Sequence, residues 1–213
     1  TVFSSGATFT DNYASDQSTN PSATTPANGI GNDQDNSDVY GSIVANSAPS
    51  FIGNGTLTAV PEDTTNPAGD TISNLFAFSD PNAGASLSGM AVVSNPANAT
   101  TEGKWQYSPD GTTWVDVGTV AEGLTALALS AATKVRFVPV ANYNGTPSPL
   151  TVRALDNTYA GPFSSSTTPV NVDTSNPGGI RPIAAATATL GASIGAVNDQ
   201  PSFTATNPTA VNE

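Results

Sequence analysis

The sequence predicts an all-β protein: an antiparallel β-sandwich preceded by an extended polar N-terminal segment. Three observations predict this class. Short runs in which apolar and polar residues alternate recur along the chain, and that period is typical of half-buried strands. Turn-forming residues separate these runs, with 19 Gly and 17 Pro among 213 residues. Long runs of strong helix formers are absent from the sequence.

Composition divides the chain into three parts. Residues 1–47 are polar and rich in turn residues, with strands plausible only at 2–10 and 39–45. Such a segment buries too little apolar surface to offset its ordering entropy, so we expect it to be the tail of a preceding repeat or a donor segment. Residues 48–197 contain enough strands for a complete sandwich. Residues 198–213 are interpreted as a repeat junction, followed by the start of another repeat or a donor strand.

Within the central part, period-2 runs and turn residues define the expected strands. The clearest is a hairpin over 103–118, where Ser-Pro-Asp-Gly makes the turn and Asp110 belongs to turn chemistry rather than to a ligand set. A last strand is expected over 183–197, although its alanines also permit a helix. The other expected strands cover 57–63, 72–80, 86–95, 124–130, 134–140 and 150–156.

The large apolar side chains of these runs are expected to form the core. They are Phe51, Phe76, Phe78, Trp105, Trp114, Leu127, Phe137 and Val152. The alternative is a carbohydrate-binding module in which Trp105, Trp114 and Tyr143 form an exposed platform for surface glycans. Exposed rings in one plane favour that alternative, and buried rings argue against it.

Charge and missing residue types narrow the function classes. The formal charge is −12, so nucleic acid and anionic membranes are unfavourable partners, whereas a hard cation such as Ca²⁺ is attracted. No apolar run approaches the ~20 residues that span a bilayer, so membrane insertion is not expected. The sequence has no Cys and no His, which removes disulfides and the commonest general base. We therefore expect no enzyme and no catalytic residues, although the four glutamates leave a paired-carboxylate hydrolase as a remote alternative.

One short pattern occurs twice. Pro-Ser-Phe at 49–51 is followed by Thr-Ala-Val-Pro-Glu at 58–62, and Pro-Ser-Phe at 201–203 is followed by Thr-Ala-Val-Asn-Glu at 209–213. The spacing between the copies fits one β-domain. The pattern therefore indicates a tandem repeat, and the second copy stands where a further repeat begins.

Several motifs resemble a known family. They are "GKWQYSPDGTTWVDVG" (103–118), "RFVPVANYNG" (136–145), "LTVRALD" (150–156) and the junction "AVNDQPSF" (196–203). Together they are similar to the cadherin-like and Ig-like tandem repeats, or extender domains, of large bacterial surface adhesins. This resemblance implies a secreted, extracellular β-sandwich with a structural or adhesive role, stiffened by calcium and joined to adjacent repeats or neighbouring copies.

The resemblance also implies the metal ligands. Calcium takes six to eight oxygen ligands, which strand ends and linkers at a pole of a sandwich can supply. The expected ligands are Glu62, Asp63, Asp80, Asn82, Asp156, Asn198 and Asp199. The first junction departs from the pattern, because Ser47 stands where the second has Asp199. We therefore expect that the first junction binds calcium more weakly.

A separate acidic run, "NDQDNSD" (32–38), supplies weaker candidates: Asp33, Asp35 and Asp38. The EF-hand loop needs Gly at its sixth position and Glu at its twelfth. Counted from Asp33, these positions hold Asp38 and Val44, so the EF-hand pattern fails and only a looser site remains.

Two functions follow from these patterns. The first is a structural or adhesive building block of a bacterial surface adhesin or fibre. The alternative is an extracellular filament subunit that assembles by strand donation, with 1–10 and 203–213 as candidate donors.

Overall fold

The fold is that of an all-β sandwich, and it was obtained as a computed structural model that describes residues 45–205. Its larger sheet has the strand order β12-β9-β6-β11-β13-β2, and its smaller sheet the order β4-β10-β7-β8. Two short pairs, β1-β5 and β14-β3, complete the body. Neighbouring strands are antiparallel except in the pairs β13-β2 and β14-β3.

The strands alternate with turns along the whole described chain. Their bounds are β1 Ser50–Ile52, β2 Gly55–Thr56, β3 Val60–Pro61, β4 Asp70–Thr71, β5 Ala77–Ser79, β6 Leu87–Ser94, β7 Gly103–Ser108, β8 Val115–Asp116, β9 Ala126–Ser130, β10 Lys134–Pro139, β11 Leu150–Asp156, β12 Asn171–Val172, β13 Ala188–Gly191 and β14 Ile194–Gly195. Among residues 45–205 the only helix is the 3-10 turn η1, Ile72–Asn74, and no helix in this range is long and apolar enough to cross a membrane.

The main core lies between the two sheets. The smaller sheet contributes Trp105, Tyr107 and Phe137, all nearly inaccessible to solvent, with the Trp105 and Phe137 rings in edge contact at 5.3 Å between centroids. Met90 and Leu129 face them from the larger sheet. Alternate residues of each strand point inward, which explains why the period-2 runs of the sequence located these strands.

The larger sheet is covered on both faces. Ala91, Val93 and Leu155 belong to a second apolar cluster on its outer face, together with Phe163 and Ile183 from the segment that follows β11. The guanidinium of Arg153 holds this segment by donating to the backbone oxygens of residues 184 and 185. Burial on both sides explains the nearly continuous apolar runs of β6 and β9.

Several sequence predictions need correction in detail. The strand expected over 72–80 is β5 preceded by η1, because the chain turns at Ile72–Asn74 before it pairs with β1. The strand expected over 183–197 is two short strands, β13 and β14, interrupted at residues 192–193. Phe51, Phe78 and Trp114 lie at intermediate depth rather than in the buried core. The strand predicted at 2–10 lies outside the described residues, as does all but the last residue of the strand predicted at 39–45.

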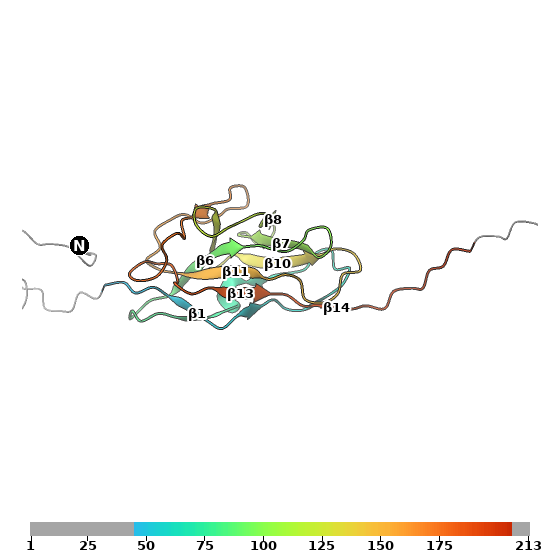
Figure 1. Cartoon of the computed structure of the whole chain (residues 1–213), viewed down its shortest axis with the longest axis horizontal. Helices are drawn as coiled ribbons and strands as arrows, with labels where there is room; N and C mark the ends of the chain where they lie inside the picture. Colours follow the sequence, from blue (N-terminus) through green and yellow to red (C-terminus); the bar gives the residue numbers. More distant parts are fainter. Residues whose placement is uncertain (1–44, 206–213) are drawn as a thin grey trace, which may run out of the picture.

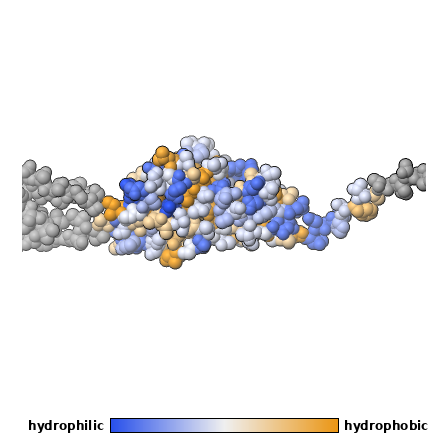
Figure 2. Space-filling model, in the orientation of Figure 1, coloured by the Kyte–Doolittle hydropathy of each residue, from blue (hydrophilic) through white to orange (hydrophobic). Residues whose placement is uncertain are grey.

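The body is elongated, and the described chain enters and leaves it at opposite ends (Figure 1). We call these ends the entry pole, where residues 45–49 lead into β1, and the exit pole, where β14 leads into residues 196–205. Figure 2 shows that the outgoing segment stands clear of the body. Phe203 in this segment is 90% exposed.

Candidate functional site

The entry pole gathers four of the oxygen-bearing side chains, here called the entry cluster: Asn46, Asp80, Asn82 and Asp156. Three segments bring them together, because the chain entering β1 passes between the turn after β5 and the end of β11. The Asn82 Oδ1 accepts a hydrogen bond from the Ser47 backbone N–H at 2.6 Å, and the Asn82 Nδ2 donates to the Ala45 oxygen at 3.0 Å. Asn82 therefore fixes the incoming strand.

Asp156 is the buried member of this cluster, with 0% of its surface exposed. Its Oδ1 accepts hydrogen bonds from the Thr158 backbone N–H, at 2.7 Å, and from the Thr158 hydroxyl. Its Oδ2 accepts only a long bond, 3.3 Å, from the Asn46 Nδ2, which is also 3.3 Å from the Ile180 oxygen. The amide of Asn46 thus sits between two oxygens that hold it weakly.

Asp80 has an unsatisfied oxygen. Its Oδ1 accepts a hydrogen bond from the Asn82 backbone N–H at 2.7 Å, which closes a tight turn. Its Oδ2 is buried and has no hydrogen-bond partner. Buried carboxylate oxygens are almost always paired, so an orphaned one calls for an explanation such as an ion.

The exit pole gathers a second set, here called the exit cluster: Glu62, Asp63, Asn142 and Asn144. The Glu62 Oε1 accepts a hydrogen bond from the Val197 backbone N–H at 2.6 Å, and its Oε2 accepts one from the Asn144 Nδ2 at 3.0 Å. The Asp63 Oδ1 accepts one from the Asn142 backbone N–H at 2.8 Å. Both carboxylates of this cluster therefore hold the chain's own N–H groups.

The structure thus divides the predicted ligands between two ends of the body. Asp80, Asn82 and Asp156 meet at the entry pole, and Glu62 and Asp63 lie at the exit pole. Asn198 and Asp199 are exposed on the outgoing segment, where the Asn198 Nδ2 donates a 3.4 Å hydrogen bond to the Asp199 backbone oxygen. The weaker candidates, Asp33, Asp35 and Asp38, lie outside the described residues.

The entry cluster fits a hard cation better than the exit cluster does. It offers two carboxylates, one with an orphaned oxygen, together with amide and backbone oxygens, which are the ligands that calcium takes. Asp80 and Asp156 would hold the ion, and Asn46 would present its amide oxygen only after the amide turns over, because its Nδ2 faces Asp156. Within residues 45–205 no group of three Asp, Glu, His or Cys side chains forms a metal-binding set. Two carboxylates indicate weak binding.

Three residues of the two clusters, Asn46, Asn142 and Asn144, were not among the ligands expected from the sequence. Asn46 occupies the position in the first junction that Asn198 occupies in the second, and that correspondence was the available signal. Asn142 and Asn144 lie in the loop after β10, and nothing in their local sequence indicates that this loop meets Glu62. Only the path of the chain from β10 to β11 brings them to the exit pole.

The aromatic platform proposed for glycans does not form. Trp105 is 1% exposed and packs between the sheets, with its indole N–H donating to the Ser148 oxygen at 3.0 Å. Tyr143 packs against Phe137. Trp114 lies on the outer face of the smaller sheet, where the Arg136 guanidinium stacks on its ring at 3.9 Å from the centroid. The three rings therefore do not share a plane open to a sugar.

The hairpin turn behaves as the sequence predicts. The Asp110 Oδ1 accepts hydrogen bonds from the backbone N–H groups of Thr113 and Thr112, at 2.7 and 2.8 Å. These two bonds lower the pKa of Asp110 well below its ordinary value. The Asp110 carboxylate therefore stabilises the turn between β7 and β8.

No protein-family model matches this sequence, and comparison with curated proteins and with solved structures finds no similar chain.

Proposed function

We propose that the chain is an extracellular structural or adhesive building block of a bacterial surface adhesin or fibre, in which β-sandwich modules join end to end and calcium stiffens the junctions. One observation carries the proposal. The entry pole seats an Asn-X-X-Pro-Ser-Phe segment at 46–51, and the outgoing segment presents the same pattern at 198–203 without a body around it.

The way in which the first copy is seated supports this interpretation. Pro49 is buried, and the Phe51 ring stacks on Phe76 with 4.1 Å between centroids. The corresponding Phe203 is 90% exposed. A module with the same entry pole, in the same chain or in a neighbouring copy, would partly bury Phe203 as this one partly buries Phe51. That burial would contribute up to roughly 1.5–3 kcal/mol, the value for a fully buried side chain.

The junctions differ in charge. In the first, Ser47 supplies a backbone N–H to Asn82, and its side chain is a neutral hydroxyl. The second junction has Asp199 at this position. Seated in the same way, Asp199 would place a third carboxylate beside the equivalents of Asp80 and Asp156. Affinity for calcium rises with the number of charged ligands, so the second junction is the stronger candidate.

Thermal unfolding of the full chain in calcium or in chelator tests this proposal. Extracellular modules bind calcium with Kd of roughly 10⁻⁴–10⁻³ M, so 10 mM calcium is expected to add about 1.4–2.7 kcal/mol to the free energy of unfolding. The Ser47→Asp variant reproduces the second junction at the entry pole and is expected to respond at lower calcium concentration. If neither protein shifts its melting temperature, calcium is not part of the junction.

The exposed outgoing segment also favours the second candidate, a filament that assembles by strand donation. In that arrangement residues 198–203 of one copy take the place of 46–51 in the next. Light scattering of the purified full chain separates the candidates. A protein that stays monomeric at all concentrations contradicts the filament, and assembly that is abolished by Phe203→Ser supports it.

A further inference from the structure

Two parallel pairings stand out among the otherwise antiparallel strands of residues 45–205. β2 pairs with β13, and β3 pairs with β14. Between and beyond these short strands, backbone bonds continue the contact: the N–H groups of Leu57, Val60 and Glu62 donate to the oxygens of Gly191, Ser193 and Gly195, at 2.9, 3.2 and 2.8 Å. We call this continuous contact between residues 54–62 and residues 189–197 the terminal seam.

The direction of the seam has a mechanical consequence. Residues 54–62 follow the entry pole and residues 189–197 lead to the exit pole, so tension on the two ends of the body pulls the two segments in opposite directions along their length (Figure 1). The seam's hydrogen bonds run across that direction. Under such shear the bonds must fail together, whereas strands peeled from one end lose them one at a time. We propose that the terminal seam is the element that resists tension between the poles.

Both ends of the seam are locked by side chains. At one end the Asn54 Oδ1 accepts a hydrogen bond from the Thr189 backbone N–H at 2.9 Å. At the other end the Glu62 Oε1 accepts the Val197 N–H at 2.6 Å. Glu62 is 5% exposed, so water competes poorly for this charge-assisted bond. The carboxylate predicted as a calcium ligand is thus part of the seam.

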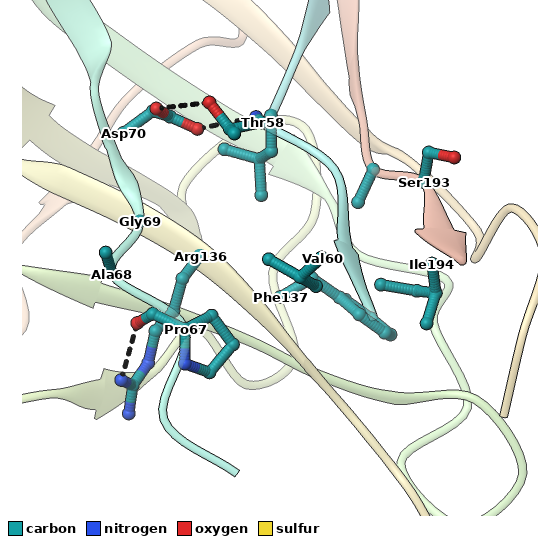
Figure 3. A pocket seen from close by; sticks show the side chains of 12 residues that line it. Thr58, Val60, Pro67, Ala68, Gly69, Asp70, Arg136, Phe137, Ser193 and Ile194 are labelled. Atoms are coloured by element: carbon teal, nitrogen blue, oxygen red, sulfur yellow. Dashed lines mark hydrogen bonds between the residues drawn. The ribbon is translucent and has the colours of Figure 1, made fainter. Parts of the chain in front are cut away.

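The seam is also tied to the rest of the body. The backbone groups of Gly145 and Ile194 exchange two hydrogen bonds of 2.9 Å, which join β14 to the loop after β10. On the other side, Thr58 donates from its N–H and its hydroxyl to the Asp70 carboxylate, at 2.7 and 3.0 Å, next to a cavity of about 140 Å³ (Figure 3). These ties hold residues 54–62 in place while the seam is under load.

The biological use of this device rests on the proposed function, but its test does not require calcium. The sequence has no cysteine, so a pair of introduced cysteines fixes the two points at which a single molecule is pulled. Thr1→Cys with Glu213→Cys pulls along the seam. Thr65→Cys with Glu213→Cys pulls both segments from the exit pole and peels them apart. Both are full chains with every seam residue intact, and both are pulled in chelator.

The unfolding force is expected to be at least about twofold higher along the seam than in the peeling geometry, because hydrogen bonds of modest individual strength add up only when they are loaded together. Equal forces in the two geometries would overturn the proposal. If the force along the seam is high in chelator and calcium does not raise the melting temperature, the proposal of calcium-bound junctions fails and the proposal of the seam stands.

A pair of glutamate variants tests whether the seam is the part of the molecule that resists unfolding under tension. Glu62→Ala removes the lock at the exit end and is expected to lower the force along the seam. Glu122→Ala is the matched control, since the Glu122 carboxylate accepts hydrogen bonds from the Arg153 guanidinium, outside the seam and outside the loop after β10. It is expected to leave that force unchanged. If both variants lower the force equally, the seam is not the resisting element.

Discussion

The two poles are built from the same residue types and differ in how their oxygens are used. At the exit pole, the Glu62 carboxylate accepts hydrogen bonds from Val197 and Asn144 on both oxygens. At the entry pole, Asp80 has one buried oxygen with no partner, and Asp156 has one that accepts only a 3.3 Å bond. Similar composition therefore leaves the carboxylate oxygens of Glu62 fully partnered at one end and those of Asp80 and Asp156 only partly partnered at the other.

The largest expected effect is at Asp156. Asp156→Ala removes the buried carboxylate that accepts the Thr158 N–H and hydroxyl, and we expect it to lower the free energy of unfolding by about 2–3 kcal/mol. Urea denaturation measures this loss. Asp199→Ala is the control, because Asp199 is exposed on the outgoing segment and its loss is expected to cost less than about 0.5 kcal/mol. Equal losses in the two variants would contradict the role of Asp156 in holding the entry pole.

Glu62→Ala is expected to have the next largest effect, about 1–2 kcal/mol, since it leaves the Val197 N–H without its partner. The more informative result is its calcium response. If the exit cluster is structural, the variant should gain as much stability from 10 mM calcium as the unmodified chain does. If calcium no longer stabilises the variant, Glu62 is a calcium ligand, as the resemblance implies.

The sequence predicted the centre of the fold better than its ends. Strands such as β7 and β10 were found because Trp105 and Phe137 alternate with polar residues over several positions. The parallel partners β2 and β3 have two residues each, too few for any period to appear. Which pole a loop occupies depends on the direction of its strand, so the sequence shows which oxygen-bearing residues follow the strands but not which of them lie together. Glu62 and Asp156 looked equivalent in sequence and lie at opposite ends.

Asp80→Asn separates calcium binding from folding. The Asp80 Oδ2 has no partner that the substitution removes, so in chelator we expect the free energy of unfolding to change by less than about 1 kcal/mol. In calcium the stabilisation should disappear, because a charged ligand has been lost. Thermal unfolding in both conditions checks this. A variant that keeps the full calcium response places the ion elsewhere.

The smallest expected effect is a loss of stability at low pH, and it arises at the exit pole. Glu102 lies there, because its carbonyl accepts the Val140 N–H beside the loop that holds Asp63. Its pKa is lowered from the ordinary value of 4.5, chiefly by the Asn98 N–H and further by the N–H and hydroxyl of Ser148.

A carboxylate whose pKa is lower in the folded state than in the unfolded state contributes stability above its unfolded pKa, and that stability is lost as the pH falls through the folded value. We therefore expect the exit pole to weaken below about pH 4.5, the ordinary pKa of a glutamate. Glu102→Gln should flatten the pH dependence of the melting temperature in that range while leaving the calcium response at neutral pH intact. Because Glu102 is partly open to solvent, the shift is expected to be small. An unchanged pH profile would show that the acid response arises from other carboxylates, such as Asp110 and Asp116, whose pKa values are also lowered by hydrogen bonds.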